Sequence, residues 1–197
     1  MVARMWVTPV TLEGRFIRLE PLGPEHAAGL WAVSEDAEIY RFKPYVMRSE
    51  ADMQQFIAKA RAAHDRGEGM AFATIDRASG VPVGSSSYYT ADERHRRVEI
   101  GATWVTPTRQ RTPINTEAKL LMLRHAFEGL GCLRVEFKTD RLNEKSRRAL
   151  ERIGAVEEGI FRNHMVMPDG RIRDSVYFSI IASEWPAVQA RLEGFLG

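Results

Sequence analysis

The sequence predicts an α/β (α+β) fold in which helices cover both faces of a mixed, mostly antiparallel sheet. Three observations lead to this prediction. Helical patterns come early, a run of strand patterns separated by turn signals follows, and helix and strand patterns then alternate. The 197 residues are 44% hydrophobic and 27% charged, which suits one sizeable core. No repeat or low-complexity linker divides the sequence, so we expect a single domain over residues 1–197.

The first half of the chain is expected to contain short helices and a strand meander. Alternation with period two stops at Pro21, as a strand would, and Pro24 suits the first turn of a helix. Ser49 followed by Asp52 resembles a capping box, and apolar residues recur behind it at helical spacing until Gly67. The expected elements of this half are a strand at 12–20, a short helix after Pro24, a loop or broken helix at 34–48, a helix at 49–67, and strands at 70–76, 81–90 and 98–105.

The second half is expected to alternate helix and strand. Thr112 and Pro113 suit the N-cap and first position of a mostly buried helix, although Asn115 offers a later start. Asn143 suits the N-cap of another helix, which Gly154 would end as a left-handed cap. The remaining expected elements are a strand at 134–139, a hairpin of 155–162 and 171–181, and a closing helix capped by Ser183, with Pro186 in its first turn and with Trp185, Val188, Leu192 and Phe195 facing inward.

A basic turn stands between the strand at 98–105 and the buried helix. Arg109, Gln110 and Arg111 precede the helix start, where free backbone N–H groups and the positive end of the dipole attract anions, phosphate especially. A second basic cluster, Arg94 to Arg97, would add positive charge if it lay beside this turn, but a solvated loop is the favoured interpretation of this cluster. The pattern therefore predicts a phosphate-binding turn.

These segments, taken in order, resemble the acetyl-CoA-binding core of the GNAT acyltransferases. The stretches 115–119 and 143–155 resemble the RimJ/RimL-type branch, which is best known for acetylating protein N-termini. The likeness covers about residues 12–185 and implies the GNAT fold, with acetyl-CoA (CoA) as cofactor. The residues that it places against the cofactor are Trp104, Val105, Thr106, Arg109, Gln110, Arg111, Thr112, Ile114, Asn115, Thr116, Asn143 and Ser146.

The turn departs from the family pattern at two positions. Where the family's phosphate turn usually has Gly, and Gly or Ala, this sequence has Pro113 and Asn115. Proline removes an amide donor and asparagine adds a side chain. An alternative therefore stays open, in which the chain is a GNAT-fold protein that binds CoA or another ligand with weak or no turnover.

Glu99 is the candidate general base. A carboxylate is unusual in a central strand, and burial there would raise its pKa toward the useful range. The resemblance supports this role, because Glu99 stands eleven residues before Gln110, where Glu precedes Ile in histone acetyltransferase members of the family. The alternative is an outward-facing glutamate paired with Arg97. The resemblance also implies that a strand N–H near Thr103 or Val105 polarises the thioester carbonyl.

Ser146 is the candidate acid that protonates the leaving sulfur, again by resemblance. The alternative for Ser146 is a small polar residue on a tightly packed face. Three tyrosines, Tyr88, Tyr89 and Tyr177, are further candidate proton donors.

The acceptor is expected to be a primary amine, with a protein or peptide N-terminus favoured by the resemblance and a small amine behind it. An α-amine is about a tenth neutral at pH 7, whereas a lysine amine is neutral at only roughly a few parts in ten thousand. A weak base would therefore suffice for an N-terminus. The loop at 34–48 mixes acidic and aromatic residues, which suits a cationic amine, although its aromatics could simply pack on the core. The candidate substrate contacts are Tyr40, Phe42, Tyr45 and Tyr88.

Composition excludes or disfavours several other functions. The net charge is +2, and the nucleic-acid reading rests only on the arginine clusters. The five histidines show no metal-ligand spacing, so no metal is expected, and Cys132 is expected to be a buried, inert thiol. No run of about 18 apolar residues suggests a membrane span, and the start is too short for a signal peptide. We expect a cytoplasmic protein and leave a homodimer open.

Overall fold

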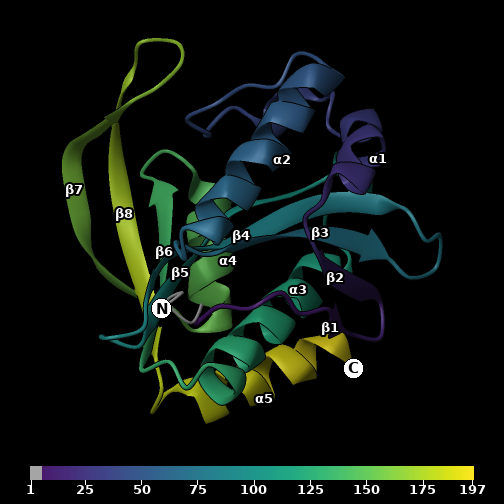
Figure 1. Ribbon diagram of the computed structural model, residues 1–197. Coiled ribbons are helices and arrows are strands. Elements are labelled where there is room, and N and C mark those ends of the chain that lie inside the picture. Colours follow the sequence, from purple (N-terminus) through teal and green to yellow (C-terminus); the bar gives the residue numbers. More distant parts are fainter. Residues whose placement is uncertain (1–5) are drawn as a thin grey trace.

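An eight-stranded sheet forms the centre of the computed structural model, which describes residues 6–197 (Figure 1). The strand order is β1-β2-β3-β4-β5-β6-β8-β7, and in this described part all neighbours are antiparallel except β5 and β6. The strands are β1 (Leu12–Glu13), β2 (Ile17–Pro21), β3 (Met70–Asp76), β4 (Pro82–Asp92), β5 (Arg97–Val105), β6 (Arg134–Asp140), β7 (Val156–Val166) and β8 (Ile172–Ile181). The helices are α1 (Ala27–Ala32), α2 (Glu50–Asp65), α3 (Pro113–Arg124), α4 (Glu144–Ile153) and α5 (Trp185–Leu196).

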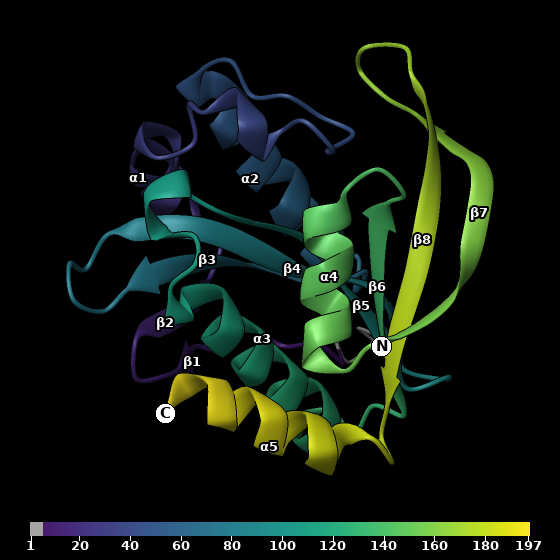
Figure 2. The ribbon, with the colours of Figure 1, turned by 180° about the vertical axis from the view of Figure 1, so that it is seen from behind.

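Helices cover both faces of this sheet, as the sequence predicts. Figure 1 shows α1 and α2 on one face, and Figure 2, seen from behind, shows α3, α4 and α5 on the other. Each layer has its own apolar core. Met53, Ile57 and Trp104 belong to the α2 side, whereas Met122 and Phe137 belong to the α3 side. Burial of these two cores supplies the main driving force for the fold.

The helix ends follow the local signals in the sequence. Thr112 caps α3 and Pro113 is its first residue, so the earlier of the two predicted starts is correct. The Asn143 side chain accepts the Ser146 amide at 3.1 Å and caps α4, which ends at Gly154 with a φ of +99°. Both caps satisfy backbone groups that a helix end leaves unpaired.

The predicted first strand at 12–20 is two strands in the structure. The chain turns after Gly14, whose amide donates to the Ile17 carbonyl at 2.9 Å, and β1 folds back on β2. Glu117 of α3 holds this turn, because its buried carboxylate accepts the amides of residues 15–17 at 2.6–2.7 Å. A Cβ on Gly14 would lie 2.3 Å from the Glu117 carboxyl carbon, which explains why a glycine fits there.

The closing helix differs from its prediction at both ends. Glu184 is the N-cap of α5 rather than Ser183, and its carboxylate accepts the Ile181 amide at 2.9 Å. Phe195, which was expected to face inward, is 43% exposed. Its ring packs against the guanidinium of Arg152, 4.2 Å from the ring centroid, and this cation–π contact replaces burial in the core.

No helix among residues 6–197 has both the length and the apolar composition needed to cross a bilayer.

Pro186 lies in the first turn of α5, and Trp185, Val188 and Leu192 are buried, as predicted.

Candidate active site

The parallel pairing of β5 with β6 is short. Only the β5 residues from Arg97 to Glu99 have partners in β6. Beyond Glu99, β5 keeps β4 as its neighbour through a register shift near Ser86, where Ala102 has a φ of +48°. The other edge of β5, over residues 100–105, has no strand partner within residues 6–197. We call the point where β5 and β6 separate the fork. Beyond the fork, the free edge of β5 can pair with an extended ligand.

Glu99 lies at the fork and is only 6% exposed. Burial is the main cause that raises the pKa of its carboxyl group. Lys138 of β6 opposes this shift, with its Nζ 3.4 Å from Glu99 Oε2. Arg97, the alternative partner, instead contacts Glu136 at 3.1 Å and Asp92 at 3.4 Å. A buried carboxylate with a raised pKa has the properties of a general base.

Two tyrosines flank Glu99 from neighbouring strands. Tyr89 is the register partner of Glu99 on β4, and burial raises the pKa of its hydroxyl. Tyr177 is the register partner of Lys138 on β8, and the Lys138 ammonium lies 5.9 Å from its ring centroid. These two tyrosines therefore remain candidate proton donors.

The aromatic residues of the predicted acceptor surface divide into two groups. Tyr40 (5% exposed) and Tyr88 (1% exposed) are core residues, and the Tyr88 hydroxyl donates to a carbonyl of α3 at 2.5 Å. This burial argues against substrate contact for both, and against Tyr88 as a proton donor. Tyr45 and Phe42 are partly exposed. The loop at 40–48 that carries them lies beside β8, because the Phe42 carbonyl accepts from Arg173 at 3.2 Å.

Gln110 ties the basic turn to two other elements. Its Nε2 donates to the Val105 carbonyl at 3.0 Å, and its Oε1 accepts from Lys145 of α4. Arg111 follows it with a φ of +60° and an exposed side chain. Thr112 then caps α3 by accepting the Ile114 amide at 3.4 Å. The turn thus places an exposed guanidinium beside the positive end of α3, an arrangement that favours anions.

A cavity of 380 Å³ adjoins this turn. Its lining includes three arginines, Arg15, Arg77 and Arg109, together with the first residues of α3. The Arg109 guanidinium pairs with the Asp76 carboxylate at 2.9 Å, so its charge is partly compensated. The cavity is nevertheless rich in donors, which suits an anionic group.

The other predicted cofactor residues lie on both sides of the fork. Trp104, Val105 and Thr106 follow the free edge of β5 with side chains only 5–8% exposed, so a ligand there would meet their main chain. Thr116 and Asn115 lie in the first turns of α3, and the Thr116 hydroxyl is engaged by Arg152 at 3.0 Å. Ser146, partly exposed, follows the cap Asn143 in α4.

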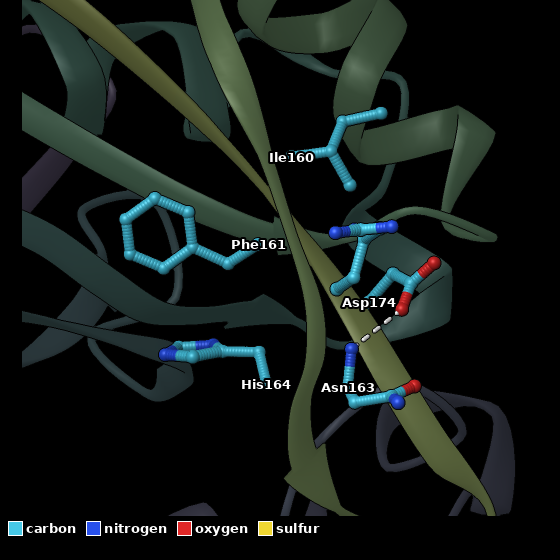
Figure 3. A pocket seen from close by; sticks show the side chains of 6 residues that line it. Ile160, Phe161, Asn163, His164 and Asp174 are labelled. Atoms are coloured by element: carbon cyan, nitrogen blue, oxygen red, sulfur yellow. Dashed lines mark hydrogen bonds between the residues drawn. The ribbon is translucent and has the colours of Figure 1, made fainter.

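An open cavity of 810 Å³ lies on the terminal hairpin, next to Tyr177. Figure 3 shows Phe161 and His164 on one side of β7, and Asn163 and Asp174 on the other. Phe161 packs on Tyr177 with ring centroids 4.4 Å apart, and His164 lies 5.9 Å from the same ring. Because Tyr177 contacts Lys138 and Lys138 contacts Glu99, these aromatics form a wall near the candidate base.

Sequence reasoning did not assign four basic residues to the site: Lys43, Lys119, Lys138 and Arg173. Each approaches the fork from a different element: the loop at 40–48, α3, β6 and β8. Lys138 lies two residues after Glu136 in β6, so the two side chains share a face of the sheet. Glu136 is the register partner of Glu99, and this spacing is the local signal that places Lys138 near Glu99. Lys119 lies within a mostly apolar helical stretch, a position where an unpaired lysine is unusual.

The basic cluster at 94–97 is a solvent-exposed turn and does not lie beside the phosphate turn. It lies between β4 and β5, so nearly the whole of β5, about 27 Å, separates it from Thr106. Arg96 Nε donates to the Gly131 carbonyl at 2.8 Å, and His95 contacts Asp92 at 2.8 Å. These contacts hold the exposed turn against neighbouring segments, in agreement with the favoured interpretation as a solvated loop.

Two further predictions concern metals and the single cysteine. Within residues 6–197 no group of three or more His, Cys, Asp or Glu side chains could hold a metal ion. Cys132 is 2% exposed, and burial raises the pKa of its thiol to about 12. Such a thiol is protonated at neutral pH and is a poor nucleophile.

Comparison with known proteins finds similar sequences and structures. Residues 17–156 match the sequence profile described as the acetyltransferase (GNAT) domain. YdaF of Bacillus subtilis (strain 168), which carries the provisional name ribosomal N-acetyltransferase, is 36% identical over 106 residues. That match covers 54% of this chain and 57% of YdaF, so it spans little more than half of that relative's length.

Solved structures resemble the whole fold. A GCN5-related N-acetyltransferase from Brucella melitensis has a TM-score of 0.90 and 34% identity, covering 96% of this chain and 86% of that one. RimJ of Mycobacterium smegmatis, solved in complex with CoA-disulfide, has a TM-score of 0.81 and 23% identity, covering 94% of each chain. At that identity the RimJ likeness concerns the fold alone.

Proposed function

Because the chain belongs to the GNAT acetyltransferase family, we propose that it transfers an acetyl group from acetyl-CoA to a primary amine. The acceptor amine attacks directly in a ternary complex of protein, acetyl-CoA and amine. A protein or peptide N-terminus is the favoured acceptor, and a small amine is the alternative.

One observation carries this proposal: β5 leaves β6 at a buried glutamate. The edge of β5 over residues 100–105 has no strand partner within residues 6–197, although the Thr103 and Val105 carbonyls accept side-chain donors. The amide groups of a pantetheine arm could pair with the other main-chain groups of this edge. The edge begins at Glu99, whose raised pKa suits proton transfer from an amine. An extended ligand on this edge would therefore place its thioester end near a base.

The residues of the turn fit the opposite end of acetyl-CoA. The diphosphate would lie at the first turn of α3, near Arg111 and the capped N-terminus. Pro113 occupies the first helical position, where the missing N–H costs the helix nothing but removes one donor for a phosphate. Asn115 is partly exposed in the same turn and would narrow the approach. Arg15, Arg77 and Arg109 in the adjoining cavity could compensate.

Acetyl-CoA supplies an acetyl group activated as a thioester. The acceptor nitrogen forms a bond to the carbonyl carbon while the carbon–sulfur bond breaks. Glu99 takes the proton that the nitrogen loses, directly or through a water. The departing sulfur receives a proton from Ser146 or Tyr177, and a β5 amide near Thr103 donates to the carbonyl oxygen. Each group has one role, and the proton gained by Glu99 balances the proton given to sulfur.

An N-terminal acceptor is supported by the chemistry and by the relatives. An α-amine is about a tenth neutral at pH 7, so it needs only a modest base such as a partly buried glutamate. The provisional name of YdaF describes a ribosomal N-acetyltransferase, which is consistent with a protein acceptor. The aromatic wall of Phe161, His164 and Tyr177 would hold the first side chains of a peptide.

A second candidate function is binding of CoA without turnover. Pro113 and Asn115 favour it, because they replace the small residues that let a backbone approach phosphates closely. Calorimetric titration with acetyl-CoA, together with thiol release over a panel of peptides and amines, separates the two. Micromolar binding with thiol release supports the enzyme, whereas binding without release supports the second candidate. Tighter binding by Pro113→Gly and Asn115→Gly would show that the turn is degenerate.

A further inference from the structure

Two lysines, the buried Lys119 and the partly exposed Lys43, both contact Thr103 on the free edge of β5. The Lys43 ammonium donates to the Thr103 carbonyl at 3.1 Å, and the Lys119 ammonium donates to the Thr103 hydroxyl at 2.8 Å. Lys43 comes from the loop on the α2 side of the sheet, whereas Lys119 comes from α3 on the other side. Both side chains thus reach the opening between β5 and β6 from opposite faces.

Arg173 of β8 adds a third cation. It is 4% exposed, donates from Nη1 to the Phe42 carbonyl at 3.2 Å and donates from Nε to the Ser175 hydroxyl at 2.9 Å. Its charge acts directly on Lys43, the residue that follows Phe42. Lys43, Lys119 and Arg173 therefore form one group, which we call the cation cluster.

No carboxylate among residues 6–197 lies within 4.0 Å of a nitrogen of the cation cluster. Glu99, the buried carboxylate at the fork, is paired with Lys138 instead. The hydrogen-bond acceptors of the two ammonium groups are the Thr103 carbonyl and hydroxyl, and the Lys119 ammonium lies 5.6 Å from the Phe137 ring centroid. Burial and mutual repulsion lower the pKa of Lys43 to about 8 and that of Lys119 to about 7.

Such an arrangement is costly for the protein alone. Removing a charged ammonium group from water costs several kcal/mol unless an opposite charge compensates it. The pantetheine arm, which would occupy this edge of β5 under the proposed function, is neutral and supplies no such charge. It would also compete with Lys43 for the Thr103 carbonyl and so release the ammonium. A carboxylate on a group near the thioester would compensate the positive charge and keep the lysines protonated.

We infer that Lys43, Lys119 and Arg173 form a subsite for a carboxylate carried by one of the two substrates. This inference rests on the proposed function and narrows its substrate class. One source is the acyl group, as in a dicarboxylic acyl-CoA. The other source is the acceptor, as in an α-amino acid, whose carboxylate lies next to the amine. In both cases the carboxylate would lie a few ångströms from the bond that is formed.

Two matched pairs of ligands distinguish these sources. The acyl pair is succinyl-CoA against acetyl-CoA, titrated into the protein by calorimetry. The acceptor pair is L-phenylalanine against L-phenylalaninamide, titrated into the protein saturated with CoA. We expect the carboxylate member of one pair to bind at least tenfold more tightly, about 1.4 kcal/mol. Whichever pair shows the preference identifies the source.

Substitutions then test the assignment to the cation cluster. Lys43→Met and Lys119→Met should each reduce the preference below about threefold, whereas the control Lys59→Met, an exposed lysine of α2, should keep it. If Lys119→Met does not fold, Lys43→Met in the loop still decides the outcome.

Three results would overturn the inference. Equal binding within both pairs, with normal acetyl-CoA affinity, would reject the subsite and leave the proposed function intact. If the carboxylate ligand still bound more tightly than its partner to Lys43→Met and Lys119→Met, its carboxylate would bind at a site other than the cation cluster. If the protein binds neither CoA nor acetyl-CoA, both the proposed function and this inference are wrong.

Discussion

At the scale of single residues, Glu99 determines whether the fork can act in catalysis. It is buried between β4 and β6, and its one ion-pair partner within residues 6–197, Lys138, lies at 3.4 Å. Burial favours the protonated form and Lys138 favours the charged form, so the pKa of Glu99 depends on the balance of these two effects. That balance can be tested from both sides.

Glu99→Gln removes the proton acceptor but keeps the size of the side chain. We expect the turnover rate to fall by about 10²-fold or more, with the Kd for acetyl-CoA unchanged within twofold. Thiol release and calorimetry measure the two quantities. Glu93→Gln, in the exposed β4–β5 turn, is the matched control and should retain full activity. Unchanged turnover in Glu99→Gln would reject Glu99 as the base.

Lys138→Met removes the charge that opposes the raised pKa of Glu99. The pKa of Glu99 should then rise further, because burial and the Glu136 charge remain. A base must be ionised to act, so the acidic limb of the pH–rate profile should move to higher pH. Profiles of kcat/KM measure this shift, with Lys59→Met as control. A shift to lower pH would mean that a different group controls the acidic limb.

Lys119 links the same region to stability. Its folded-state pKa of about 7 lies below the ordinary value of 10.5, so the unfolded chain binds more protons between these pH values. The free energy of unfolding of the natural sequence should therefore rise as the pH rises from 7 to 10. The lowered pKa of Lys119 corresponds to a loss of at most about 5 kcal/mol in the free energy of unfolding at neutral pH.

Lys119→Met should flatten this pH dependence and raise the free energy of unfolding at pH 7 by at least about 1 kcal/mol, after allowing about 1 kcal/mol for the lost hydrogen bond. Urea denaturation at pH 7 and pH 9.5 measures both effects. Lys59→Met should change neither. If Lys119→Met lost the same stability at both pH values, Lys119 would be a neutral side chain that stabilises the fold through its packing and hydrogen bond.

At the scale of elements, the sequence predicts those features that depend on neighbouring residues. Thr112, Asn143 and Gly154 mark helix ends correctly, because capping uses side-chain and backbone groups within four residues. The first strand was predicted as one because its break depends on Glu117, about 100 residues away. Ser183 was wrong as the N-cap because α5 begins at Trp185, which puts Glu184 at the cap position.

Asn143 caps α4 and is also a candidate contact to acetyl-CoA, and substitutions can separate these two roles. Asn143→Ala leaves the Ser146 amide unpaired and should cost about 1 kcal/mol of stability, whereas Asn143→Ser keeps a capping oxygen. If Asn143 also contacts acetyl-CoA, both variants should weaken its binding severalfold. Thermal unfolding and calorimetry give the two readouts. Wild-type affinity in the Asn143→Ser variant would limit Asn143 to capping.

At the scale of the whole molecule, the mixed, mostly antiparallel sheet and the helices on both faces could be predicted, whereas the strand order and the charges at the fork could not. Glu99 and the basic turn lie within one stretch of chain, so their spacing was visible. Lys43, Lys119 and Arg173 come from three distant segments that only tertiary packing brings together. A pattern of local periodicity carries no information about such convergence.

The fork also predicts where a bound ligand should change the dynamics of the whole molecule. Amides on the unpaired edge of β5 and in the first turn of α3 have few internal partners, so they should exchange with solvent faster than paired amides. Acetyl-CoA that pairs with this edge should slow exchange in peptides covering 100–106 and 110–117. The β2–β3 ladder, which is fully paired, should not respond.

Hydrogen exchange followed by mass spectrometry, with and without acetyl-CoA, measures this pattern. Glu99→Gln is a useful comparison, because it should lose turnover yet keep the protection if Glu99 acts only on the acceptor. Protection spread evenly over the chain would indicate general stabilisation by a ligand bound elsewhere. Protection confined to β7 and β8 would place the ligand on the terminal hairpin and remove the fork as the site of the thioester.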